Sequence, residues 1–154
     1  MSDQFIKILV AGALLVHGLG HTGAIGALLF INLSHSTNNG TGTGTGIDTG
    51  GWLPARSWLL PSLGSPTATT VASIFWVLST IGFVAAAMSF WGFLVPSDAW
   101  RQIAIVSSFI SILGIALFFG TWPPFNTVAA LAVNVAVLVT QLWLYWPPQE
   151  MFGR

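Results

Sequence analysis

Residues 5–33 read FIKILVAGALLVHGLGHTGAIGALLFINL, an apolar run whose ionisable side chains are Lys7, His17 and His21. At 1.5 Å per residue, a helix of this length exceeds the roughly 30 Å of a bilayer's hydrocarbon core. The two histidines are four residues apart and therefore share one helix face near mid-depth. Ionisable side chains at that depth are costly and are by default a hypothesis about function. The stretch predicts a membrane span that carries a site.

The composition extends this prediction to the whole chain. Its 154 residues are 54% hydrophobic and 5% charged, with a mean hydropathy of +0.80, whereas a soluble domain is about 25% charged. The formal net charge is zero, which provides no basic surface for nucleic acid. The absence of cysteine excludes disulfides and thiolate metal sites. We therefore expect an integral membrane protein.

Four apolar segments are long enough to cross a bilayer: about 5–33, 69–95, 100–119 and 125–146. Lipid offers the backbone no hydrogen-bond partners, so all four are expected to be helical. The first is too long for a secretory signal, and we interpret it as a retained span. Short connections containing Pro96 and Pro123-Pro124 favour antiparallel neighbours. The sequence predicts an all-α, integral membrane four-helix up-down bundle, with residues 1–154 as a single domain.

The loop at 34–68 is the only sizeable region expected outside the membrane. It begins with His35 and Asn38-Asn39-Gly40, followed by Thr-Gly repeats through Gly46, a stretch that has little to bury and should be flexible. It continues with Trp52-Leu53-Pro54 and Trp58-Leu59-Leu60-Pro61, a segment suited to the headgroup boundary or to a lid over the bundle. Residues 39–41 match a glycosylation sequon, which matters only in a eukaryotic secretory pathway.

The basic residues predict the orientation. With four spans, both termini share a side with the loop between the second and third spans. That side carries Lys7, Arg101 and Arg154, whereas the other carries only Arg56. By the positive-inside rule, both termini are expected in the cytoplasm and the first loop outside, in the cytoplasmic membrane if the source is bacterial.

Small and polar residues indicate where the spans touch, because helix contacts in lipid depend on close approach and interhelical hydrogen bonds. Gly20 lies on the histidine face, and we expect a helix or a flat ring to approach there. In the fourth span Thr127, Asn134 and Gln141 recur every seven residues. The third span has a similar polar group: Ser107, Ser108 and Ser111. A seam of Asn134 and Gln141 facing the histidines predicts either a structural network or a ligand pocket.

Two chemistries fit the histidine pair poorly. Imidazoles at i and i+4 can chelate one metal ion, but a stable site needs three or four ligands, and no span contains Asp, Glu or Cys. His35 lies roughly 21 Å beyond His21 along a continuous helix and could join only if that helix ended early. A transport function is also disfavoured, because the spans show no acidic relay, no inverted repeat and no broken central helix. We predict no metal site.

Two other ligands remain open. A single histidine can hold the metal of a haem or chlorin, although a same-face pair cannot supply both axial ligands of one haem. A quinone carbonyl could accept a hydrogen bond from an imidazole, and histidine can exchange protons near physiological pH. Possible cofactors are thus a quinone or a single-histidine tetrapyrrole.

The motif His17-Gly18-x-Gly20-His21, in a four-span chain of this size, resembles small bacterial four-span membrane proteins, including the DoxX-like group. That group is associated with respiratory or sulfur-redox membrane complexes. The resemblance implies a quinone-linked partner.

We predict a non-enzymatic integral membrane subunit or binding protein whose buried histidine pair contacts a partner helix, a quinone or a tetrapyrrole. The predicted binding residues are His17, His21, Gly20, Asn134 and Gln141. The alternative is a quinone-linked membrane redox protein that uses the histidine pair for proton exchange. The expected partners are the bilayer and either other membrane subunits or further copies of the chain.

Overall fold

The computed structural model describes residues 2–37 and 50–151, with no account of the side chains of residues 32–37 and 149. Its elements are α1 (Asp3–Thr37), α2 (Ser65–Ser89), α3 (Trp100–Leu117), α4 (Pro124–Leu138), a π-helical turn η1 (Val139–Trp143) and a 3-10 helix η2 (Gln149–Met151). No strand occurs in these two ranges. The Thr-Gly repeats, the sequon and the His35 side chain lie outside what the structure describes.

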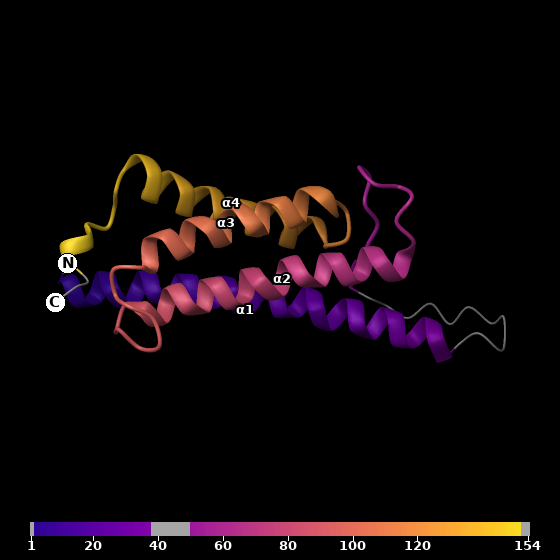
Figure 1. Ribbon diagram of the computed structural model, residues 1–154, viewed down its shortest axis with the longest axis horizontal. Coiled ribbons are helices and arrows are strands. Elements are labelled where there is room, and N and C mark those ends of the chain that lie inside the picture. The colour runs from indigo at the N-terminus through magenta and orange to yellow at the C-terminus, as the bar shows by residue number, and fades with distance from the viewer. Residues whose placement is uncertain (1, 38–49, 152–154) are drawn as a thin grey trace.

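The predicted fold class is confirmed. The four helices run side by side along the long axis of the molecule, and the start of α1 lies at the same end as η2 (Figure 1). Each helix is long and apolar enough to cross a membrane, with α4 continuing through η1 to Trp143. Consecutive helices alternate in direction, as the short connections predicted.

Both ends of α2 differ from the apolar segment of the sequence. α2 ends at Ser89 and not near residue 95, because Gly92 and Leu94 adopt φ values of 64° and 63°. Left-handed residues cannot continue a right-handed helix. α2 also begins earlier than its apolar run, at Ser65, where Pro66 fits the first turn because the amide it lacks would have no intrahelical partner.

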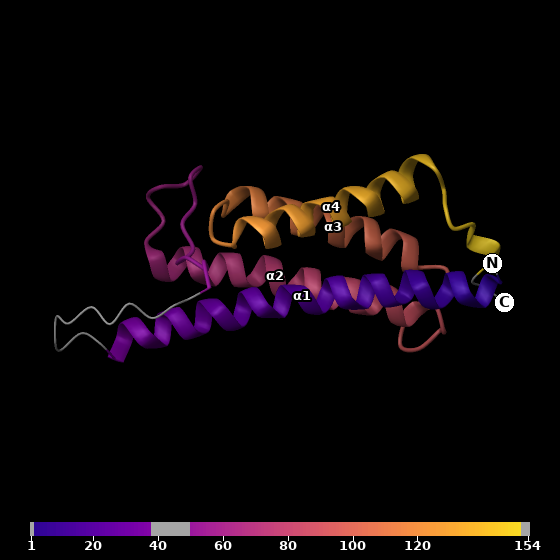
Figure 2. The ribbon, with the colours of Figure 1, turned by 180° about the vertical axis from the view of Figure 1, so that it is seen from behind.

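The packing follows chain order. α1 packs along α2, α2 along α3 and α3 along α4, whereas α1 and α4 have no comparable contact in the described part of the chain. Figure 2 shows α4 above α1 from behind, with the two helices diverging toward the end that carries η2. The bundle is therefore open along its α1–α4 side.

The segment that precedes α2 covers the other end of the bundle. The Leu53 amide donates to Thr121 O at 3.0 Å, and the Trp52 ring lies 5.9 Å from the Trp122 ring. Ala55 is fully buried, while the Trp58 side chain is 66% exposed and donates through Nε1 to Ala116 O. This part of the first loop therefore packs on the connection between α3 and α4 and also presents an exposed tryptophan.

Arg101 attaches the segment after α4 to the start of α3. Its Nη2 donates to Pro147 O at 2.9 Å and to Tyr145 O at 3.4 Å. We expect Arg101→Ala to speed chymotrypsin cleavage after Tyr145 about fivefold, because charge-assisted hydrogen bonds worth on the order of 1 kcal/mol are lost. Arg56→Ala, which removes an exposed arginine elsewhere, is the control. Equal cleavage rates in the two variants would contradict this attachment.

Candidate functional site

The two histidines of α1 lie edge to face, with ring centroids 4.9 Å apart. His21 is only 1% exposed, and its ring lies 5.4 Å from the Trp122 ring and 6.0 Å from the Phe83 ring. Its Nδ1 donates to His17 O, one helical turn earlier, at 3.0 Å. His17 is half-buried and packs edge-on against Phe83 at 4.6 Å. The shared helix face thus gives one fully buried and one partly accessible imidazole.

Two polar residues from other helices complete a network around the pair. The Oγ of Ser111 in α3 lies 2.8 Å from His21 Nε2. Asn134 of α4 donates from its Nδ2 to the same Ser111 Oγ at 2.7 Å. His17 Nε2 lies 3.0 Å from Asn134 Oδ1. Because interhelical hydrogen bonds are a main source of helix association in lipid, the network connects α1, α3 and α4 at one depth.

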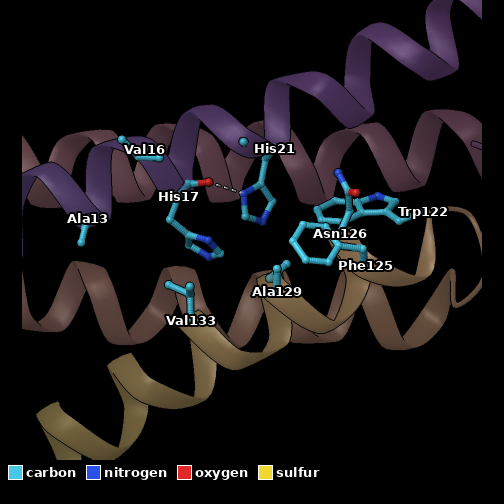
Figure 3. Close-up of a pocket in the computed structure, with 11 residues that line it drawn as sticks. Ala13, Val16, His17, His21, Trp122, Phe125, Asn126, Ala129 and Val133 are labelled. Atoms are coloured by element: carbon cyan, nitrogen blue, oxygen red, sulfur yellow. Dashed lines mark hydrogen bonds between the residues drawn. The ribbon is translucent and has the colours of Figure 1, made fainter. Parts of the chain in front are cut away.

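His17 also lines a groove of about 420 Å³ between α1 and α4 (Figure 3). Its other walls are formed mainly by apolar residues, among them Trp122, Phe125, Ala129 and Val133. Phe125, at the rim, is 82% exposed, so the groove opens on the outside of the bundle. The volume falls within the roughly 300–1,000 Å³ of pockets that take small molecules.

The structure brings His17, His21 and Asn134 together but leaves Gln141 apart. Gln141 Nε2 donates to Trp146 O at 2.8 Å and to Thr140 Oγ1 at 3.1 Å. Gln141 lies in η1, beyond the end of α4. Seven residues of helix advance about 10 Å, so Gln141 is too far from Asn134 along the chain to reach the histidines. The expected seam therefore reduces to one residue at this site.

Of the two expectations for Gly20, the close approach of a helix is wrong, and the approach of a flat ring stays a prediction. A Cβ added at Gly20 would meet nothing within 4 Å, and Gly20 instead lines the groove. The close approach falls on Gly18, where a Cβ would lie 2.9 Å from Phe83 Cβ and 3.3 Å from Thr80 O. The histidine face of α1 thus leads into the groove, and the neighbouring face at Gly18 packs on α2.

Sequence reasoning did not assign Ser111 and Trp122 to the site. Ser107 and Ser108 donate to carbonyls of their own helix, Ile103 O and Ala104 O, and only Ser111 bonds across to other helices. Three serines so close in sequence cannot be separated by periodicity alone. Trp122 precedes Pro123-Pro124 in the short connection between the third and fourth spans, and its contact with His21 depends on how that connection folds back.

The parts of the chain that the structure describes contain no group of three or more His, Cys, Asp or Glu side chains placed to hold a metal ion. The site's polar atoms are imidazole nitrogens, a hydroxyl and an amide. Such groups suit hydrogen bonding to a neutral ligand.

No family model matches the chain, and no curated protein or solved structure is significantly similar to it. The resemblance to DoxX-like proteins therefore stays a prediction, and function has to be argued from the site.

Proposed function

We propose that the protein is a non-enzymatic, membrane-embedded binding protein or subunit. Its α1–α4 groove takes a small, lipid-soluble ring molecule directly from the bilayer, and His17 provides the polar contact. The observation that carries the proposal is the half-buried His17 imidazole in the wall of an otherwise largely apolar, laterally open groove. Pockets of this kind hold ligands by apolar contact and use a few polar groups for orientation.

A quinone-sized ring suits this groove better than a tetrapyrrole. His17 Nε2, the less crowded ring nitrogen and the usual axial ligand of a haem, is engaged by Asn134 Oδ1 at 3.0 Å. Nδ1 lies next to the side-chain stem, where a metal-centred macrocycle would collide with α1. A single six-membered ring between Trp122 and Val133 is much smaller than a macrocycle, so a substituent on it can approach His17 without that collision.

The second candidate function is a quinone-linked membrane redox protein in which the histidines exchange protons. Its support is the hydrogen-bonded chain that leads from the groove at His17 to the buried His21. An electron carrier would have to come from a partner subunit. For either function we propose the orientation predicted from the basic residues, with both termini in the cytoplasm.

Filling the groove should abolish binding without unfolding the protein. Ala129 is exposed and lines the groove, so Ala129→Phe adds a ring into its space. The neighbouring Val128 is 66% exposed and does not line the groove, which makes Val128→Phe the matched control. With the protein in lipid nanodiscs and 4-heptylphenol as the probe, equilibrium dialysis against empty nanodiscs measures binding. We expect at least about tenfold weaker binding in Ala129→Phe alone.

Equal binding by both variants and the unmodified protein would place the probe outside the groove and contradict the proposal. No binding beyond that of empty nanodiscs by the unmodified protein would contradict it as well. Unfolding midpoints measured in parallel show whether either substitution has damaged the fold.

A further inference from the structure

The site's hydrogen bonds form a closed ring, and one backbone group fixes its direction. His17 O is a carbonyl and can only accept, so His21 Nδ1 carries a hydrogen and donates to it. In a neutral imidazole the other nitrogen is then an acceptor, and Ser111 Oγ donates to His21 Nε2. Each later bond follows from this assignment.

The ring continues through α4 back to His17. Because the Ser111 hydrogen is used on His21, its oxygen accepts from Asn134 Nδ2. Asn134 Oδ1 is then the acceptor for His17 Nε2, which must carry a hydrogen. His17 Nδ1 is left with a lone pair and has no hydrogen-bond partner in the described part of the chain.

The opposite direction requires a charge on His21. If Asn134 donated to His17, Ser111 would have to donate to Asn134, and His21 would need hydrogens on both nitrogens. Such a cation would lie near the Phe83 and Trp122 rings, while the sequences of the four helices contain no Asp or Glu other than Asp3, the first residue of α1. Burying an unpaired charge is expensive, so the neutral ring is the stable arrangement.

We infer that the groove recognises an aromatic hydroxyl, that of a phenol or a quinol, by accepting its hydrogen at His17 Nδ1. This inference rests on the proposed function and specifies its ligand. Both imidazole N–H groups are used inside the ring, so the pair has none to offer to a quinone carbonyl. The apolar walls near Trp122 and Phe125 suit the ring of such a ligand. The groove therefore selects the hydroxylated form of a ring molecule over its carbonyl or ether form.

A matched pair of probes tests this selection. 4-Heptylphenol and 4-heptylanisole differ only by methylation of the oxygen, which removes the donor and keeps the apolar body. With the protein in nanodiscs and empty nanodiscs as the partition control, we expect the phenol to bind about five- to tenfold more tightly. Equal or tighter binding of the ether would overturn the hydroxyl preference and leave the binding function standing. Binding of neither probe would overturn both proposals.

Asn134 is the positioning residue in this scheme, since it holds His17 in the tautomer that leaves Nδ1 free. In Asn134→Leu the constraint on the His17 tautomer is lost. We expect the ratio of the phenol's affinity to the ether's affinity to fall toward one, while the ether binds as before. Thr127→Val is the control, because Thr127 Oγ1 bonds to the Trp122 and Pro123 carbonyls of its own turn and not to the ring. A ratio unchanged in Asn134→Leu would contradict this role.

A measurement without any ligand tests the tautomers directly. In protein labelled with 15N-histidine, we expect His17 to carry its hydrogen on Nε2 and His21 to carry it on Nδ1, so that the two residues show opposite tautomers. His17→Gln and His21→Gln assign the signals, and His35→Gln removes the third histidine from the spectrum. The same tautomer at both sites, or a hydrogen on His17 Nδ1, would overturn the inference even if a probe binds.

Discussion

Replacing Gly18 by leucine is expected to be one of the two most damaging single changes in α1. A Cβ at this position would lie 2.9 Å from Phe83 Cβ and 3.3 Å from Thr80 O. The second of these atoms is backbone of α2 and cannot rotate away, so α1 and α2 would have to separate. Overpacking of this kind costs about 3 kcal/mol, or roughly 10 °C in the unfolding midpoint for a chain of this size.

The matched control is Gly20→Leu on the same helix. A Cβ there meets nothing within 4 Å, so the unfolding midpoint in detergent should change little. Because Gly20 lines the groove, the same variant should weaken binding of 4-heptylphenol. Similar losses of thermal stability at the two glycines would show that α1 does not pack on α2 as described.

The second large effect is expected at the histidines, where alanine substitutions should distinguish a structural role for His21 from a binding role for His17. His21→Ala leaves a cavity between the Phe83 and Trp122 rings and removes the acceptor of Ser111. Cavity formation and a lost buried hydrogen bond together cost about 2–4 kcal/mol. His17→Ala removes a half-buried ring and should cost about 1 kcal/mol, while it abolishes the preference for the phenol over the ether.

Thermal unfolding and probe binding, measured on both variants, check this division. We expect His21→Ala to lose mainly stability and His17→Ala mainly ligand selection. His21→Phe, which keeps most of the volume but not the hydrogen bonds, should fall between His21→Ala and the unmodified protein in stability. If the two alanine variants lose equal stability and retain equal selectivity, the division between a structural and a binding histidine is wrong.

The groove and the network together explain why a polar site can persist inside a membrane bundle. His17 O and Ser111 satisfy the two nitrogens of His21, and Asn134 satisfies one nitrogen of His17, all without any charge. His17 itself lines the groove between α1 and α4. The same contacts that hold the helices together therefore determine which atom the groove presents to an occupant.

The sequence by itself determined the number of spans and the common face of the histidines. Both follow from local rules: the length of apolar helix a bilayer requires, and the spacing that places residues i and i+4 together. It also indicated Asn134 as a polar counterpart, since an amide in a membrane span needs a partner. The end of α2 could not be predicted from the sequence, because the apolar run continues through Gly92 and Leu94 although the backbone there turns left-handed.

Only the tertiary structure decided which of several equivalent residues meet. Gly18 and Gly20 are both small, and the crossing of α1 on α2 alone makes Gly18 the contact and leaves Gly20 open. Asn134 and Gln141 are seven residues apart, but Gln141 lies beyond α4, in η1, and only Asn134 reaches His17. Periodicity in the sequence determines the face of the helix on which a side chain lies. The residue that this side chain meets depends on the axial offset and the crossing angle of two helices. Both arise from packing between segments that are distant in sequence.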